Sequence, residues 1–357
     1  MVTYYQLGAD RQLNDIVMAG SHDAAITEGG SNAQTQDLDI LGQAEAGVRI
    51  FDIRITGAIV KSGGANDVGA LKAYHGSNLK VFGGKQTVTD LRSNETGKMK
   101  IKPMKLGTYG MTLSKILSDA ARFVQEHGDE FLILKFDKCD NWPLIAEACV
   151  DILGASICTL RGNLNTRKLS ELRGKVIVLF SVKGREATGW PDAAARGILA
   201  FQNMTGGGAF NRNFDGLQYF GKGGTNAFAV WRSNKDKLKE NMERQARLMQ
   251  KGAATDPKVM GMMYWTSTGL AQSIHARNDF MWNEENTVKL MDLWASRVPK
   301  NVDRTASSSG AMLKEFMPNF VMIDFANADR CQKIYDLNLL AASRMSKAVK
   351  RFYGDKL

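Results

Sequence analysis

Short apolar runs alternate with longer amphipathic stretches along nearly the whole chain, and this alternation constrains the fold more than any other feature. The apolar runs predict strands at 15–21, 48–55, 69–75, 130–137, 175–182, 259–267 and 319–325. The amphipathic stretches predict helices at 111–128, 142–154, 233–252, 283–297 and near 329–352. The pattern therefore predicts an α/β fold in which helices cover a parallel sheet, either closed into a barrel or left open and doubly wound.

No linker divides the chain, so we expect residues 1–357 to form a single domain. No GxGxxG or Walker loop follows any of the predicted strands, which argues against a dinucleotide or P-loop site. The glycine-rich tracts at 205–213 and 220–227 follow no convincing strand, and we interpret them as long loops.

The charge balance favours an anionic partner. The 47 basic and 37 acidic side chains leave a net charge of +10, which suits a phospholipid surface or nucleic acid. Aromatic residues interleaved with basic ones are missing, which argues against single-stranded nucleic acid. The segment 97–105 alternates Lys98, Lys100 and Lys102 with Met99 and Ile101, and it fits either a membrane-facing loop or an ordinary solvated one.

The sequence contains neither a basic-then-apolar leader nor about 20 consecutive apolar residues. We therefore expect a cytoplasmic protein, or a bacterial effector or toxin delivered by a non-classical secretion route, that meets membranes peripherally and is a monomer. The four cysteines lack CxxC or metal-ligand spacing, so we expect buried, reduced thiols.

Polar side chains near the ends of five predicted strands carry the chemical information. In parallel barrels the carboxyl ends of the strands meet at one mouth, and charged groups in apolar strands are costly unless they are paired or line a wet site. These residues are His22 and Asp23, Asp52 and Arg54, His75, Lys135 and Asp137, and Asp324. Two histidines can serve as base and acid, carboxylates can orient them, and an arginine can neutralise a phosphate. This set predicts phosphodiester chemistry without a metal.

Each residue also has a simpler interpretation. A lone histidine is more often structural, and an Asp-x-Arg pair is usually a salt bridge. Five strands that all end this way are far less expected by accident. His127 precedes Gly128 at a helix end, where its charge suits the helix dipole, and His275 fits a surface helix.

Several strings resemble, in order, the catalytic X region of phosphatidylinositol-specific phospholipases C, above all the small metal-independent bacterial enzymes. They are concentrated in 12–140 and comprise GSHDA (20–24), AGVRIFDIRI (46–55), YHGS (74–77) and EFLILKFDK (130–138). LRGKVIVLFS (172–181), MMYWTSTGL (262–270) and NFVMIDFAN (319–327) look like later strands of the same enzymes. The resemblance implies a distorted, incompletely closed (β/α) TIM-type barrel.

The resemblance also implies a reaction in which the inositol 2-hydroxyl displaces diacylglycerol and leaves 1,2-cyclic inositol phosphate. His22 is then the general base oriented by Asp324, and His75 is the general acid supported by Asp23. Arg54 faces the phosphate, as in the metal-independent enzymes.

Other positions follow from the same resemblance. Asp52 is expected to hold Arg54, and no cofactor is expected, with Ca²⁺ bound through Asp52 and Asp137 as the alternative. Asp137 stands where the bacterial enzymes have a lysine, and here it either binds inositol hydroxyls, pairs with Arg54 or keeps a weak metal site. The further candidate substrate contacts are Lys135, Lys183, Arg185 and Tyr219. The alternatives to this function are the same chemistry on another phospholipid or glycerophosphodiester, or a non-catalytic relative that binds anionic lipid.

Overall fold

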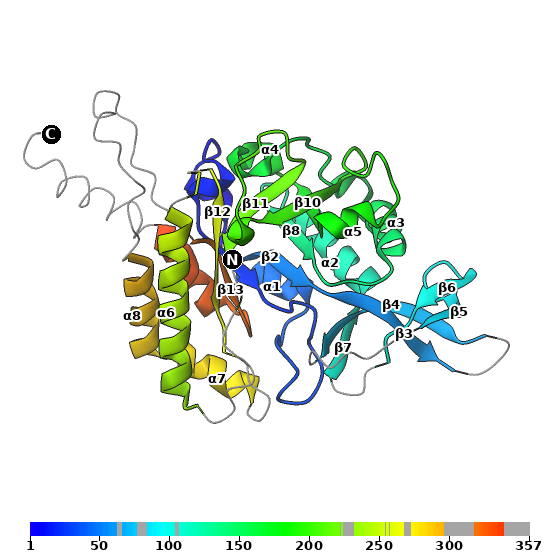
Figure 1. Cartoon of the computed structure of the whole chain (residues 1–357), viewed down its shortest axis with the longest axis horizontal. Helices are drawn as coiled ribbons and strands as arrows, with labels where there is room; N and C mark the ends of the chain where they lie inside the picture. Colours follow the sequence, from blue (N-terminus) through cyan, green and yellow to red (C-terminus); the bar gives the residue numbers. More distant parts are fainter. Residues whose placement is uncertain are drawn as a thin grey trace, which may run out of the picture.

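Eight parallel strands form a closed barrel (Figure 1). The computed structural model describes residues 1–62, 66–76, 84–103, 107–221, 223, 232–253, 255–256, 258–267, 273–295 and 318–338. The ring order is β1-β13-β12-β11-β10-β9-β8-β2, with β2 returning to β1. The barrel strands are β1 (Met18–Ser21), β2 (Val48–Ile53), β8 (Phe131–Phe136), β9 (Lys175–Ser181), β10 (Ile198–Asn203), β11 (Gly216–Gly221), β12 (Met260–Trp265) and β13 (Pro318–Ile323).

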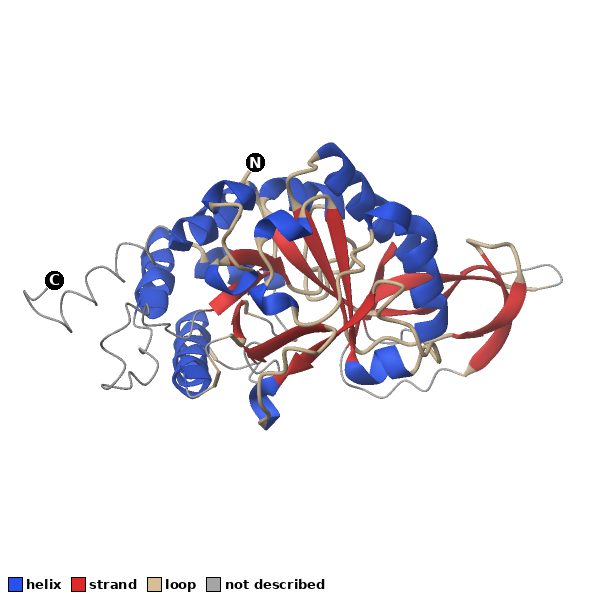
Figure 2. Ribbon diagram, turned by 90° about the horizontal axis from the view of Figure 1, so that it is seen from above, coloured by secondary structure: helices blue, strands red, loops and turns tan. Residues whose placement is uncertain are grey.

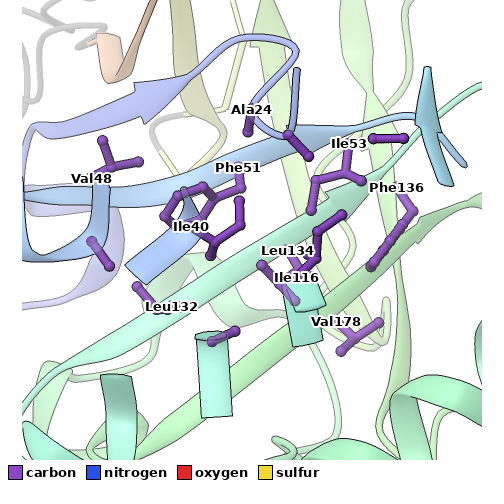
Figure 3. Packing of buried hydrophobic residues seen from close by; sticks show 14 of the residues in the cluster. Ala24, Ile40, Val48, Phe51, Ile53, Ile116, Leu132, Leu134, Phe136 and Val178 are labelled. Carbon is purple, nitrogen blue, oxygen red and sulfur yellow. The ribbon is translucent and has the colours of Figure 1, made fainter. Parts of the chain in front are cut away.

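Alternation of side chains along these strands produces two apolar layers. One layer fills the barrel and includes Met18, Ile50 and Ile133. The other lies outside the ring, where Phe51 and Leu134 meet side chains of the covering helices (Figure 3). Because each such side chain contributes about 1.5–3 kcal/mol when fully buried, both layers hold the strand ends in fixed positions.

Helices cover the outside of the barrel (Figure 2). The α-helices are α1 (Ile40–Ala46), α2 (Leu113–Glu126), α3 (Trp142–Leu153), α4 (Leu169–Leu172), α5 (Val182–Glu186), α6 (Asn234–Ala253), α7 (Ile274–Met281) and α8 (Glu284–Ala295), and residues 328–338 are also helical. The short 3₁₀ helices are Tyr4–Leu7, Leu13–Asp15, Gly154–Ser156, Leu164–Thr166 and Met204–Gly206. Asp39 and Thr112 cap α1 and α2 by accepting backbone N–H groups. The four predicted internal helices are therefore confirmed, and the fifth is helical through residue 338 with its remainder outside the described residues.

A five-stranded sheet, which we call the side sheet, is inserted between β2 and α2 and projects from the barrel (Figures 1 and 2). Its strands are β3 (Ile55–Lys61), β4 (Val68–Gly76), β5 (Lys85–Asp90), β6 (Thr96–Lys100) and β7 (Gly107–Thr112). Val88, Met99 and Ile101 are buried. A Cβ on Gly57 would lie 2.4 Å from the Lys100 carbonyl oxygen, so only glycine allows β3 and β6 to approach this closely.

The side sheet corrects two predictions. The run 69–75 was expected beside the other apolar runs in the parallel sheet, but β4 pairs antiparallel with β3 and β7. An apolar run alone does not show which sheet a strand joins. The segment 97–105 was expected as a loop, yet 96–100 form strand β6, because its alternation of lysine and apolar residues is the two-residue period of a half-buried strand.

The barrel corrects two more. The glycine-rich tract 205–213 does follow a strand, β10, and the tract 220–227 begins inside β11 and otherwise lies outside the described residues. The ring is closed, whereas the resemblance implied a gap. The barrel is nevertheless irregular, since the connection from β10 to β11 contains no α-helix. That residues 1–357 form one domain stays a prediction.

Within the described ranges, we find no helix with the length and apolarity needed to span a bilayer. The four cysteines are buried and unpaired, as predicted.

Candidate active site

The carboxyl ends of three adjacent barrel strands bring the predicted site residues together. His22 and Asp23 directly follow β1, Arg54 lies between β2 and β3, and Asp324 directly follows β13. His75 lies near the end of β4 in the side sheet, where that strand lies next to the barrel. The site is therefore built from two sheets, and the side sheet contributes one of its two histidines.

His22 is fixed by a chain of hydrogen bonds. Its Nδ1 lies 2.9 Å from Oδ1 of Asp324, and Oδ2 of Asp324 accepts a hydrogen bond from the Asn278 amide on α7 at 3.2 Å. The Gln36 amide donates to the carbonyl oxygens of His22 and Ile323, which ties the ends of β1 and β13 together. These contacts leave Nε2 of His22 as the nitrogen that faces the site.

Asp23 occupies the centre of the cluster. Its Oδ2 lies 3.4 Å from Nε2 of His22 and 3.7 Å from Nε2 of His75, and its Oδ1 lies 3.1 Å from Nε of Arg54. Burial opposes the charged carboxylate, but Arg54 and the two rings outweigh burial and hold the pKa of Asp23 well below its usual range. Asp23 adopts a left-handed backbone conformation with φ of 43°, which is uncommon outside glycine and turns the chain just after β1.

The electrostatics favour the charged form of His22. Burial works against the imidazolium, but the carboxylates of Asp23 and Asp324 outweigh it and raise the pKa of His22 to about 9. The second ring, His75, is held from its other side, because its Nδ1 lies 2.8 Å from the Ala33 carbonyl oxygen and must donate to it. Both imidazoles thus present Nε2 to the same carboxylate.

Arg54 keeps its terminal nitrogens available. Its side chain is 19% exposed, and among the described residues only Nε contacts a partner, Asp23. Burial opposes the guanidinium charge, yet Asp23 and Asp52 outweigh it and keep the pKa of Arg54 above its ordinary value. The two terminal nitrogens can therefore meet an anion that enters the mouth.

Asp52, which we expected to hold Arg54, forms its close ion pair with Lys135 and acts on the charge of Arg54 only from a greater distance. The register of β2 and β8 places Asp52 opposite Lys135, and Nζ of Lys135 lies 2.7 Å from its Oδ1. Both residues are buried, and although burial disfavours the ammonium, Asp52 outweighs it and keeps the pKa of Lys135 well above its ordinary range. Asp52 thus forms its close ion pair with Lys135, its neighbour on β8, and not with Arg54, two residues further along the chain.

Asp137 contacts Lys135, and its expected roles toward inositol hydroxyls or a metal ion stay predictions. Its side chain is about one third exposed, and its Oδ2 lies 3.9 Å from Nζ of Lys135. The described contacts include no ion pair between Asp137 and Arg54. Asp137 therefore extends the Lys135–Asp52 pair toward the mouth.

Aromatic rings line the barrel next to this pair. Lys135 lies 4.4 Å from the centre of the Phe201 ring, which in turn packs beside Tyr219. Tyr264 packs edge-on against His22 at 5.7 Å between ring centres. Burial raises the pKa of both tyrosines, so their hydroxyls stay protonated and can donate hydrogen bonds.

Lys183 and Arg185 lie on α5, beyond the end of β9. Lys183 is exposed, and Arg185 donates to the Asp215 carbonyl oxygen at 3.3 Å, immediately before β11. Arg185 lines a separate cavity of about 450 Å³ with Asp215 and Trp190. Neither side chain contacts the histidine cluster in the described part of the chain, so their predicted role in substrate binding remains a prediction.

The two remaining histidines lie outside the cluster. His127 ends α2 and packs on Phe123, and His275 is half exposed on α7, where it pairs with Asp279 at 2.8 Å. Sequence reasoning missed Gln36 and Asn278, because an amide on a loop or helix has no distinctive pattern. Tyr264 was also missed, although its place in the apolar run 259–267 offered a signal.

Comparison with known proteins locates the fold. No protein-family model and no curated protein sequence matches the chain. The solved phosphatidylinositol-specific phospholipase C of Listeria monocytogenes superposes with a TM-score of 0.52, covering 92% of this chain and 95% of its own at 15% identity. That of Staphylococcus aureus gives a TM-score of 0.53, covering 93% and 95% at 16% identity. The chain therefore has the barrel fold of the bacterial phosphatidylinositol-specific phospholipases C.

Proposed function

We propose that the chain is a phospholipase C-type phosphodiesterase that cleaves phosphatidylinositol to diacylglycerol and 1,2-cyclic inositol phosphate. The observation that carries the proposal is the convergence of Nε2 of His22 and Nε2 of His75 on Asp23, with Arg54 on the other side of that carboxylate. The fold shared with enzymes of this name supports it.

The two histidines divide the proton transfers between them. The neutral form of His22, whose fraction rises as pH approaches about 9, takes the proton of the inositol 2-hydroxyl on Nε2 while the hydroxyl oxygen bonds to phosphorus. The bond from phosphorus to the glycerol oxygen breaks, and His75 gives that oxygen its proton from Nε2. Asp324 holds the His22 ring and stabilises the imidazolium that forms, as a buried carboxylate does in other base-catalysed transfers.

Arg54 and Asp23 manage the charge of the phosphate. The free terminal nitrogens of Arg54 bind the phosphate oxygens and stabilise the negative charge that develops on them. Asp23 keeps the guanidinium in place and supports the imidazolium of His75.

The head group lies over the Lys135–Asp52 pair. We assign Tyr219, Lys135 and Asp137 to the inositol ring, because together they offer an aromatic face, donors and an acceptor to a ring rich in hydroxyl groups. A role for Lys183 and Arg185 in substrate binding stays a prediction, since both lie on α5 and make no contact with the histidine cluster in the described part of the chain.

The carboxylates at the mouth suit a reaction without a metal. Calcium prefers a shell of oxygen ligands. Of the candidate group His22, Asp23 and Asp52, whose ligand atoms lie close enough together to contact one ion, only the two carboxylates supply oxygen. Arg54 already neutralises Asp23, and the ammonium of Lys135 lies 2.7 Å from Asp52 and 3.9 Å from Asp137. Two fixed cations in this position do not fit a Ca²⁺ ion, and we infer that none is needed.

The substrate implies an anionic membrane surface as the partner, met peripherally by a monomer. The net charge of +10 supports this, and the solved Staphylococcus aureus enzyme is described in terms of its membrane binding.

The test is to incubate the protein with phosphatidylinositol vesicles in the presence of a chelator. We expect diacylglycerol and cyclic inositol phosphate as products, and near-complete loss of both in His22→Ala and His75→Ala with folding retained. Product formed only after calcium is added would overturn the metal-free mechanism. Binding without product, or cleavage of another phosphodiester only, would overturn the proposed activity.

A further inference from the structure

The hairpin of β5 and β6 presents a lysine-rich face to solvent. The register pairs Lys85 with Lys100 and Thr87 with Lys98, so these side chains share one face of the hairpin. The intervening Val88 and Met99 point the other way and are each 1% exposed. We call Lys85, Thr87, Thr89, Thr96, Lys98 and Lys100 the hairpin face.

The positive charge of this face is only partly balanced. The side chain of Lys100 pairs with Asp140 at 2.5 Å. The side chains of Lys85 and Lys98 are exposed and make no ion pair or hydrogen bond within the described ranges. Asp140 already supplies an anion beside the Lys85–Lys100 pair, so the unbalanced charge of the face is that of Lys85 and Lys98. The hairpin face therefore has the charge pattern of a surface that receives an external anion.

Among the acidic residues near the face, Asp140 pairs with Lys100 and also lies 4.0 Å from Nζ of Lys102, and it forms no ion pair with Lys85 or Lys98 in the described part of the chain. The two on the hairpin, Asp90 and Glu95, flank its turn, and Asp90 accepts the backbone N–H of Arg92 there.

The hairpin is fixed to the mouth of the candidate active site. Both backbone polar groups of Lys100 bond to the Asn141 side chain, on the loop that follows β8. Two residues further on, Nζ of Lys102 lies 4.0 Å from the centre of the Tyr74 ring, and the next residue along β4 is His75. These contacts fix the orientation of the hairpin relative to the rim of the site, where Asp140 balances the charges of Lys100 and Lys102.

We propose that the hairpin face is a docking surface for an anionic lipid bilayer and holds the barrel mouth against the membrane. Lysines near an anionic bilayer are attracted to its surface, and each strengthens binding by about fivefold. A nucleic acid is the weaker fit, because the face carries threonines and no aromatic side chain on which bases could stack. The choice of a lipid also rests on the proposed function, in which the substrate is a lipid.

The experiment measures binding to phosphatidylcholine vesicles with and without phosphatidylserine, by sedimentation of the full chain. Neither lipid is the proposed substrate, so the result does not depend on turnover. The test variant combines Lys85→Gln with Lys98→Gln. The control combines Lys235→Gln with Lys239→Gln, which removes the same charge from exposed positions of α6, far from the side sheet in Figure 1.

We expect the test variant to bind phosphatidylserine vesicles about 30-fold more weakly, with a smaller salt dependence, and the control to bind like the unchanged protein. Circular dichroism should find both variants folded, since all four lysines are exposed. Equal effects of the two variants would overturn the proposal, since net charge alone would then explain binding. The proposal would also be overturned if the test variant lost binding to a single-stranded oligonucleotide but still bound vesicles like the unchanged protein. A protein that binds as expected but does not cleave phosphatidylinositol would refute the proposed function and leave this docking surface standing.

Discussion

Replacing Asp324 by asparagine should lower the pKa of His22 by a predictable amount. In the unchanged protein Asp23 and Asp324 together outweigh the effect of burial and raise this pKa from 6.5 to about 9. The combined effect of the two carboxylates therefore exceeds the net rise. Asp23 exerts the larger Coulombic effect, but Asp324 adds a hydrogen bond at 2.9 Å to its own Coulombic effect, so we assign about half of the combined rise to Asp324. We expect the pKa of His22 in Asp324→Asn to be about 8 or lower.

The same substitution should change how stability depends on pH. Because the pKa of His22 is higher in the folded than in the unfolded chain, its contribution is fully present below pH 6.5 and is lost as pH rises through about 9. That contribution is about 3 kcal/mol in the unchanged protein and about half as much in Asp324→Asn. Loss of the Asn278 hydrogen bond to Asp324 adds a cost of about 1 kcal/mol that does not vary with pH.

Two measurements check this reasoning. The chain has four histidines, so NMR titration of their ring protons gives four curves, and the curve missing in His22→Ala belongs to His22. Denaturant unfolding between pH 6 and 10 gives the free energy of unfolding for each variant. The ascending limb of the plot of kcat/KM against pH should shift to lower pH by the same amount as the pKa of His22. A His22 pKa that stays near 9 in Asp324→Asn would refute the assignment of its cause.

Two further predictions concern other parts of the site. Asp52→Asn leaves the buried ammonium of Lys135 without its partner, so it should lower the free energy of unfolding by about 3–5 kcal/mol. The double variant that adds Lys135→Met should regain much of that free energy. If urea unfolding finds Asp52→Asn as stable as the unchanged protein, the buried ion pair is contradicted. His75→Ala should lose about a hundredfold or more in rate on the lipid but much less on an inositol phosphodiester with a nitrophenol leaving group, which needs no proton. His22→Ala should lose equally on both substrates, and equal losses in His75→Ala would exclude its role as the acid.

The strand ends of the barrel were predictable because parallel strands place their carboxyl ends at one mouth. His22, Asp23, Arg54 and Asp324 needed only the positions of three strands to be identified as neighbours. The partner of Asp52 was not predictable in the same way, since it depends on which residue of β8 the register sets opposite it. A shift of one residue between strands changes every cross-strand neighbour, and nothing in a single sequence fixes that register.

The side sheet was missed for a related reason. Only its longest strand, β4, was predicted, and Gly57 in β3 looks like a loop residue until the close approach of β6 is known. Strand β6 was recognised as lysine-rich but assigned to a loop. In contrast, α2 has a long amphipathic period, so its position was predicted to within two residues at each end.

The separate origin of the two histidines has a consequence for local cooperativity. The proposed base and its carboxylate are carried by β1 and β13 of the barrel, whereas the proposed acid is carried by a sheet that projects from the barrel and joins its core only at the outer apolar layer, through residues such as Val88 and Met99. Proteins open in such sub-global units at free energies below that of global unfolding. Opening of the side sheet alone would separate His75 from Asp23 while the barrel stays folded. Hydrogen exchange of the amides in β4 would therefore report the fraction of molecules with an assembled site, independently of barrel stability.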